Sequence, residues 1–195
     1  YAHCFTEYCK GEYKMILYHG SSVGGITELK PFLSEHKKEY VYLTSNPVVA
    51  LLYTVKSVPK PFSFYPYGFN GEKVIYSEYY ENCFEDIYKG QKGFLYYCEN
   101  VENAENPTAI NSVYTCQTPI KISGCIEIDD VFEKLMKYKE NGLFEIKPFH
   151  SVSDKELNFV YDDMRKTIKE HCLRDYPNNP MSKFIMKHFP KVWFE

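Results

Sequence analysis

Lys14-Met-Ile-Leu-Tyr-His19 is a short, mostly apolar run that leads into the loop Gly20-Ser-Ser-Val-Gly-Gly25. Apolar and aromatic residues of this kind favour a strand, whereas Gly and Ser favour turns. We therefore predict a strand that ends at His19. A histidine at a strand end, followed by Gly20, presents an imidazole and an open backbone, because a residue without Cβ lets a flat ligand approach the peptide.

Glu39-Tyr-Val-Tyr-Leu-Thr44 is a second β-type run. Alternation along a strand places Tyr40 and Tyr42 on one face. A polar residue before Pro47 then predicts the start of a helix, which carries Tyr53. Two tyrosines, one from the strand and one from the helix, can stack on a planar cationic ring such as nicotinamide. Packing of both tyrosines in the core is the alternative interpretation.

The rest of the chain predicts a mixture of strands and helices. Asn70-Gly71 predicts a hairpin turn, and Ser153-Asp-Lys-Glu156 is a capping box that opens the longest helix. We expect an α+β fold in which residues 1–149 form one domain with an inserted hairpin at about 59–92, and residues 150–195 form a helical appendage packed on the core. The other predicted elements are a central strand Gly93–Cys98, strands around Val113–Cys116 and Ile120–Ile128, and a helix from Asp129 or Asp130 to Tyr138.

Composition and charge exclude several classes of protein. The chain has 195 residues, a formal net charge of −3 and seven cysteines, and its length suits one domain with or without an appendage. The net charge argues against general nucleic-acid binding. No apolar stretch approaches the ~20 residues that span a bilayer, so we expect no membrane partner and a cytoplasmic protein with reduced cysteines. His3, Cys4 and Cys9 lack a fourth ligand at a recognisable spacing, so we expect no metal.

The order and spacing of the first two runs resemble the opening of the H-Y-E group of ADP-ribosyltransferases, which includes the diphtheria-toxin-like and poly-ADP-ribose polymerase enzymes. His19 matches the family histidine, Tyr42 the family tyrosine, and Tyr53 a second stacking aromatic. The small rifamycin-inactivating bacterial ADP-ribosyltransferases are similar over roughly residues 14 to 130. The matching motifs are His19-Gly-Ser, Val41-Tyr-Leu-Thr44, Gly93-Phe-Leu-Tyr-Tyr-Cys-Glu99, Asn106-Pro107 and Tyr114-Thr-Cys-Gln-Thr-Pro.

The resemblance implies a mixed or antiparallel β core with flanking helices around an NAD⁺ pocket. It assigns His19 a hydrogen bond to a ribose hydroxyl, and it places Gly20, with Ser21 beside it, against the carboxamide. Tyr42 and Tyr53 would stack on the nicotinamide ring. NAD⁺ would then be a substrate from which nicotinamide is released, and no metal takes part.

The family also uses an acidic residue at a third catalytic position. Cleavage of the bond between nicotinamide and ribose passes through an oxocarbenium-like state, which a nearby carboxylate stabilises. In the rifamycin enzymes the acid is an Asp just before an Asn-Pro-like loop. The equivalent stretch here offers Glu105, Glu102 and Glu99, in that order of preference by nearness to Pro107. In the alternative interpretation, all three glutamates are simply charged loop residues exposed to solvent.

The leading hypothesis is a mono-ADP-ribosyltransferase that acts on a small molecule, a protein or a nucleic-acid end. A different class of function is also open, in which the pocket has lost transferase chemistry and serves as a binding or interaction module. The inserted hairpin, which has no counterpart in the rifamycin enzymes, would then cover the pocket. RNA 2′-phosphotransferase chemistry is a third hypothesis, but it needs paired Arg and His residues that no motif identifies.

Overall fold

The computed structural model divides the chain into two units. The first comprises residues 1–55 and 90–141, and the second comprises residues 56–89 and 142–195. Both are built from strands and helices, so the predicted α+β class is confirmed. The predicted boundary between residues 149 and 150 differs from this division, because a strand before it pairs with the hairpin. The described residues are 15–33, 38–55, 67–106, 110 and 112–195.

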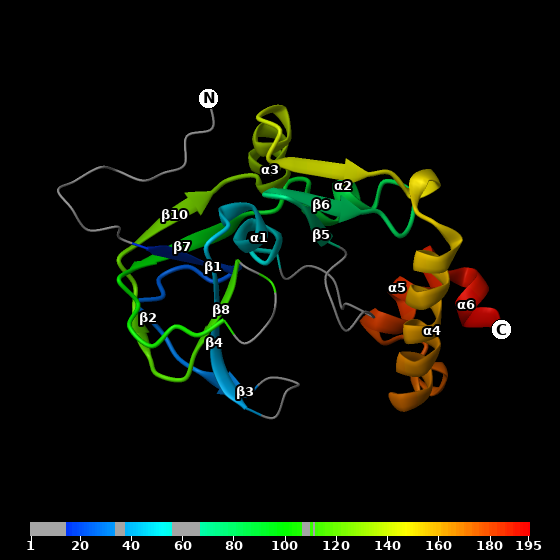
Figure 1. The fold of residues 1–195 in the computed structure, drawn as a ribbon. Helices are drawn as coiled ribbons and strands as arrows, with labels where there is room; N and C mark the ends of the chain where they lie inside the picture. Colours follow the sequence, from blue (N-terminus) through cyan, green and yellow to red (C-terminus); the bar gives the residue numbers. More distant parts are fainter. Residues whose placement is uncertain (1–14, 34–37, 56–66, 107–109, 111) are drawn as a thin grey trace. The chain divides into compact units, whose positions relative to one another are not determined.

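A six-stranded antiparallel sheet forms the frame of the first unit (Figure 1). Its order is β10-β7-β1-β4-β3, and β8 also pairs with β4, while β2 and β9 form a separate two-stranded sheet. The strands of this unit are β1 (Ile16–Ser21), β2 (Glu28–Leu29), β3 (Phe32–Leu33), β4 (Glu39–Thr44), β7 (Gly93–Glu99), β8 (Val113–Cys116), β9 (Ile120–Lys121) and β10 (Gly124–Ile128). Its helices are α1 (Pro47–Leu52) and α3 (Val131–Glu140).

The predicted strands around His19, Tyr42 and Gly93 share the six-stranded sheet, and β7 pairs with both β10 and β1 as a central strand should. The prediction of a single strand over Ile120–Ile128 is wrong. β9 pairs with β2, whereas β10 pairs with β7. The chain changes sheet at Ser123, whose N–H donates to the Tyr97 carbonyl at 2.9 Å and so starts the new pairing.

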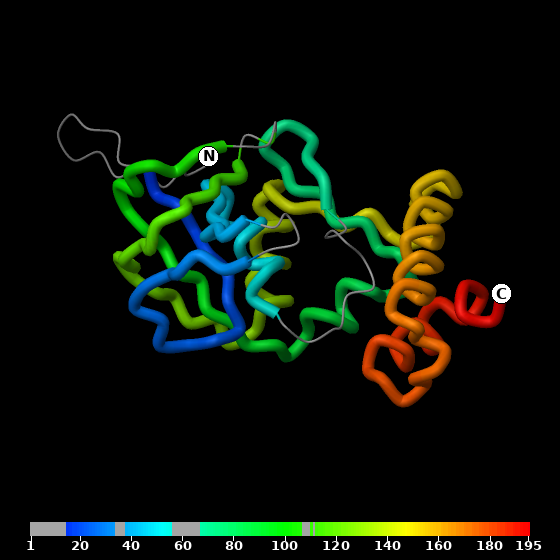
Figure 2. The backbone as a smooth tube through the Cα atoms, turned by 90° about the horizontal axis from the view of Figure 1, so that it is seen from below, coloured from blue at the N-terminus to red at the C-terminus, as the bar shows by residue number. Residues whose placement is uncertain are grey.

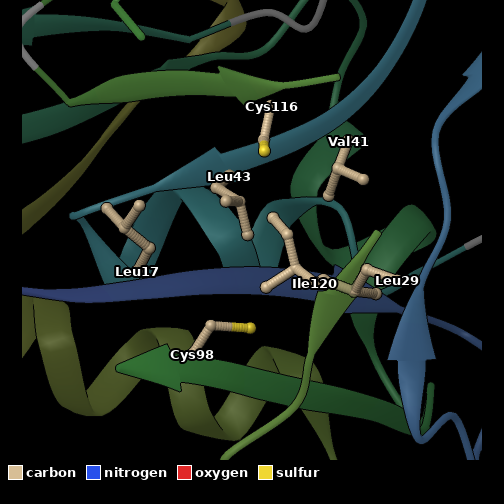
Figure 3. Close-up of a cluster of buried hydrophobic side chains, with 7 residues drawn as sticks. All are labelled: Leu17, Leu29, Val41, Leu43, Cys98, Cys116 and Ile120. Carbon is tan, nitrogen blue, oxygen red and sulfur yellow. The ribbon is translucent and has the colours of Figure 1, made fainter. Parts of the chain in front are cut away.

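One face of the six-stranded sheet carries an apolar core. Alternation along β1 and β4 sends Leu17, Val41 and Leu43 to this face, where the two-stranded sheet also contributes side chains. Burial raises the pKa of the Cys98 thiol to about 11, so this thiol stays protonated. All five described cysteines are free, as predicted. Figure 3 shows the buried cluster, which consists of Leu17, Leu29, Val41, Leu43, Cys98, Cys116 and Ile120.

β1 and β4 are joined by a single residue pair, Tyr18 with Thr44. β1 pairs with β7 along its whole length, and β4 pairs with β8 from Val41 to Thr44. Figure 1 shows β4 and β8 running across the direction of β1 and β7. Because the strands cross, their ladder ends after one pair, and Tyr42 lies just beyond its end.

α1 packs directly on β1. The side chain of Asn46 accepts hydrogen bonds from the first-turn N–H groups, at 2.9 Å from Val48, and Pro47 occupies the first turn as predicted. Residues 48–52 are all buried. A Cβ atom at Gly20 would lie 1.8 Å from the Ala50 carbonyl oxygen, so only glycine fits beneath the helix. α1 therefore fills the side of Gly20 that the sequence analysis expects to be open.

The second unit is built on a three-stranded sheet with the order β11-β6-β5. β5 and β6 form the predicted antiparallel hairpin, and β11 pairs with β6 in parallel. Asn70 pairs with Lys73, so the turn is Gly71-Glu72, one residue later than predicted, and Gly71 has a φ of +62°. The elements are β5 (Tyr67–Asn70), β6 (Lys73–Ser77), α2 (Cys83–Tyr88), β11 (Phe144–Lys147), α4 (Asp154–Glu170), α5 (Pro180–His188), α6 (Pro190–Phe194) and the 3₁₀ turns Phe149–Ser151 and Leu173–Asp175.

Aromatic rings fill the interior of the second unit. Phe84 of α2 lies with its ring centroid 5.2 Å from that of Tyr76 and 5.4 Å from that of Phe144, so helix, hairpin and β11 share one core. Burial raises the pKa of the Cys83 thiol beside Tyr76 to about 11, which makes this cysteine a poor nucleophile.

The C-terminal helices belong to this second unit. The predicted capping box of Ser153 and Glu156 is present at the start of α4. Lys147 of β11 donates to Glu156 at 2.8 Å, and this hydrogen bond, together with those from the Ser153 side chain and N–H, lowers the pKa of Glu156 to about 2. Figure 2 shows α4 beside α5 and α6. Packing of these helices on the first unit stays a prediction.

Replacing Gly20 by Ala should lower the free energy of unfolding by about 1–3 kcal/mol, the usual cost of forcing an extra methyl group into a packed site. The new Cβ would meet backbone atoms of α1, which cannot turn aside as a flexible side chain can. Urea denaturation measures the change. Gly68→Ala is the control, because nothing lies within 4 Å of its Cβ position. Equal losses in the two variants would contradict the close approach of α1.

Candidate functional site

Tyr42 is connected through strand pairing to another of the predicted site residues, Glu105. Its position in β4 is paired with Thr115 of β8, and Thr115 is paired in turn with Glu105. Paired residues of neighbouring antiparallel strands point to the same face of a sheet. The side chains of Tyr42, Thr115 and Glu105 therefore lie in one row on one face.

Glu105 is held in this row by two main-chain hydrogen bonds. Its N–H donates to the Thr115 carbonyl at 2.9 Å, and its carbonyl accepts from the Thr115 N–H at 2.8 Å. The side chain is exposed, so its carboxylate is available to a ligand. Two strand spacings separate the backbone at Glu105 from that at Tyr42, about 10 Å.

The other two acids are placed differently. Glu102 lies in an exposed turn between β7 and the paired residue Glu105. Glu99 ends β7 opposite Ile16, at the end of β1 that is remote from His19. Of the three candidates, only Glu105 is in register with Tyr42.

His19 meets Tyr42 through the backbone. Its ring atom Nδ1 lies 2.9 Å from the Tyr42 carbonyl oxygen. A carbonyl can only accept, so Nδ1 carries the proton, and Nε2 of the neutral ring is an acceptor. Burial lowers the pKa of His19, and the hydrogen bond to Tyr42 opposes this only in part. The imidazole is therefore neutral at pH 7.

The two side chains leave the sheet on different faces. Because Tyr18 pairs with Thr44, alternation places Tyr42 on the face of Thr44 and His19 on the face of Leu17. A ligand that contacts both rings must therefore lie across the end of the β1–β4 ladder, where the two strands separate.

Three further residues belong to the predicted site, namely Gly20, Ser21 and Tyr53. Ser21 uses its Oγ to accept a hydrogen bond from the Val23 N–H at 3.1 Å, which shapes the loop after β1. Tyr53 is the C-cap of α1 and is 40% exposed. Gly20 lies beneath α1, so a ligand can approach it only from directions other than its Cβ side.

Sequence reasoning missed two contributors to the site. Thr115 joins Tyr42 to Glu105 and is buried, but pairing between distant strands is not visible in one sequence. The ring centroid of Phe32, in β3, lies 5.9 Å from that of Tyr42. The ring centroid of Tyr40 lies 6.0 Å from that of Tyr42. The sequence shows these aromatic residues, but it does not show which of their rings come into contact.

The described residues present neither a metal site nor a membrane-spanning helix. No three His, Cys, Asp or Glu side chains there are grouped so that they could hold a metal ion. His3, Cys4 and Cys9 lie outside the described residues. No helix of the described part has both the length and the apolar character needed to cross a bilayer.

Comparison with known proteins adds no relative. No protein-family model, curated protein or solved structure significantly matches the chain. The similarity to ADP-ribosyltransferases therefore rests on the short motifs themselves. The membership of this chain in that superfamily stays a prediction.

The pKa of His19 should lie below 6.5 in the folded protein, because burial disfavours the imidazolium. Between that lowered value and about 6.5 the unfolded chain binds more protons than the folded chain, so the free energy of unfolding should fall as the pH falls through this range. NMR titration of the imidazole measures the pKa directly.

His19→Gln is the matched variant for this titration, because an amide can still donate to the Tyr42 carbonyl. It should reduce the pH dependence of the unfolding free energy below pH 6.5. Part of the dependence should remain, because burial also lowers the pKa of His188. A His19 pKa at or above 6.5 would show that the ring is not sheltered.

Proposed function

We propose that this protein is an NAD-dependent mono-ADP-ribosyltransferase that transfers ADP-ribose to an acceptor and releases nicotinamide. The observation that carries the proposal is the arrangement around Tyr42. The His19 ring donates to the Tyr42 carbonyl, and Glu105 lies in register with Tyr42 through Thr115. β4 thus links all three residues, with the His19 ring on one face of the sheet and the side chains of Tyr42 and Glu105 on the other.

His19 suits a hydroxyl-binding role in this scheme. With Nδ1–H engaged by the Tyr42 carbonyl, Nε2 is the ring acceptor and can receive the O–H of a ribose hydroxyl. The lowered pKa keeps the acceptor lone pair available at pH 7. Tyr42 and Tyr53 would contact the nicotinamide ring.

Glu105 suits the catalytic carboxylate. When the bond from ribose to nicotinamide breaks, its electron pair leaves with nicotinamide, and positive charge develops on the ribose. A carboxylate beside that carbon stabilises the charge before the acceptor nucleophile attacks. The exposed side chain of Glu105 can reach a ligand, and its backbone is fixed by the two hydrogen bonds to Thr115.

Glu105→Gln should lower kcat for nicotinamide release by about 10²–10³-fold, the usual effect of losing one transition-state electrostatic contact. KM for NAD⁺ should change little, because the lost interaction belongs to the transition state. The assay is incubation with NAD⁺ while free nicotinamide is followed.

Glu102→Gln is the control for this experiment, since it makes the same change of charge three residues away in an exposed turn. It should leave kcat unchanged. If wild-type protein neither binds NAD⁺ at millimolar concentration nor releases nicotinamide, the transferase proposal fails, and a binding or interaction module takes its place.

Tyr53→Ala should weaken NAD⁺ binding by about 1–3 kcal/mol, the scale of a lost aromatic contact. The side chain is 40% exposed at the end of α1, so its removal should cost little folding stability. Calorimetric titration with NAD⁺ measures the affinity. Tyr53→Phe keeps the ring and should bind as wild type does; equal affinity of the Ala and wild-type proteins would remove Tyr53 from the site.

A further inference from the structure

The chain after the site strand forms an irregular segment, Ser22–Thr27, that connects β1 to β2. It contains no helix or strand, and residues 22–25 are exposed. Such a segment has few backbone hydrogen bonds of its own, so side chains must hold it in place. It begins immediately after the predicted site residues Gly20 and Ser21.

Tyr96 of β7 supplies two of the bonds that hold this segment. Its hydroxyl donates to the Val23 carbonyl at 2.8 Å and accepts from the Ile26 N–H at 3.2 Å. The side chain is buried, and burial raises the pKa of this hydroxyl above its ordinary value, so the donor proton is retained. One buried hydroxyl thus satisfies main-chain groups at both ends of the Val23–Ile26 turn.

A second contact seats the segment on the same strand. A Cβ atom at Gly24 would lie 2.6 Å from the ring of Phe94, so the backbone of Gly24 rests on that ring. Phe94 and Tyr96 are stacked, with centroids 6.3 Å apart. The segment therefore packs on β7 through the side chains of Phe94 and Tyr96.

Tyr96, one of these two side chains, lies beside His19. Tyr96 is the cross-strand partner of His19, and side chains of paired residues stand about 5 Å apart on the same face. The segment that Tyr96 holds therefore lies on the face of the sheet from which His19 projects.

We propose that Tyr96 is a positioning residue, which holds the segment Ser22–Thr27 on the His19 face of the sheet and thereby keeps His19 sheltered and oriented for its ligand. The hydroxyl, not the ring, does this, because both hydrogen bonds end on it. The identity of the ligand as NAD⁺ rests on the proposed function. The effect on His19 does not.

Tyr96→Phe removes the hydroxyl and keeps the ring. Tyr97→Phe is the matched control, because Tyr97 is the next residue of β7, points to the other face and lies against Gly124. In Tyr96→Phe, amide hydrogen exchange at Ile26 should become at least about tenfold faster, which corresponds to about 1.4 kcal/mol. The pKa of His19, followed by NMR, should rise toward 6.5, and Tyr97→Phe should change neither.

Activity supplies a third readout. If wild-type protein releases nicotinamide, Tyr96→Phe should raise KM for NAD⁺ more than it lowers kcat, since a positioning residue acts on binding through His19. If wild-type protein does not use NAD⁺, the proposed function fails, and the exchange and pKa measurements alone decide the role of Tyr96. An unchanged Ile26 exchange rate together with an unchanged His19 pKa would overturn it.

Gly24→Ala tests the same idea without touching Tyr96. Its Cβ would meet the tip of the Phe94 ring, so either the ring or the segment must shift. Faster exchange at Ile26 shows that the segment has shifted, and the His19 pKa should then rise again. If Tyr96→Phe does not fold, this variant carries the test. A Gly24→Ala protein with faster exchange at Ile26 but a wild-type His19 pKa would contradict the proposal.

Discussion

The close approach of α1 to Gly20 is the constraint on which the first unit depends. The Ala50 carbonyl occupies the space that a side chain at position 20 would need, so α1 lies directly on β1. Asn46 fixes where the helix begins, immediately after β4 ends at Thr44. Gly20, which in the sequence suggests a ligand contact, is thus required for the packing of α1 on β1.

The crossing of β1 and β4 gives the candidate site its form. The ladder between them has one residue pair, and near its end the His19 ring donates to the Tyr42 carbonyl. This bond settles the tautomer of the imidazole, while burial keeps it neutral. On the other side of β4, regular pairing with β8 brings Glu105 into register with Tyr42. One edge of β4 thus forms only one residue pair with β1 and meets the His19 ring, whereas its other edge pairs regularly with β8.

The second unit follows a different principle. Its core is aromatic, and its strands combine one antiparallel and one parallel pair, so segments 67–77 and 144–147 depend on each other. The hairpin is therefore not a simple insertion into the first unit, and the C-terminal helices are not a simple appendage. Lys147 and Glu156 connect β11 to α4 within this unit. Its buried Cys83 is held protonated, so it adds no nucleophile.

Local signals in the sequence determined the helix caps and most strands of this protein. Asn46 before Pro47, the capping box at Ser153 and Glu156, and the alternating run Glu39–Thr44 act through neighbouring residues, so their effects are visible in the chain alone. Strand partners are long-range choices. Only the tertiary structure decided that β9 and β10 separate, that β11 joins the hairpin, and that Glu105 rather than Glu102 or Glu99 lies level with Tyr42. Such choices depend on the burial of side chains far apart in sequence, for which short motifs carry no signal.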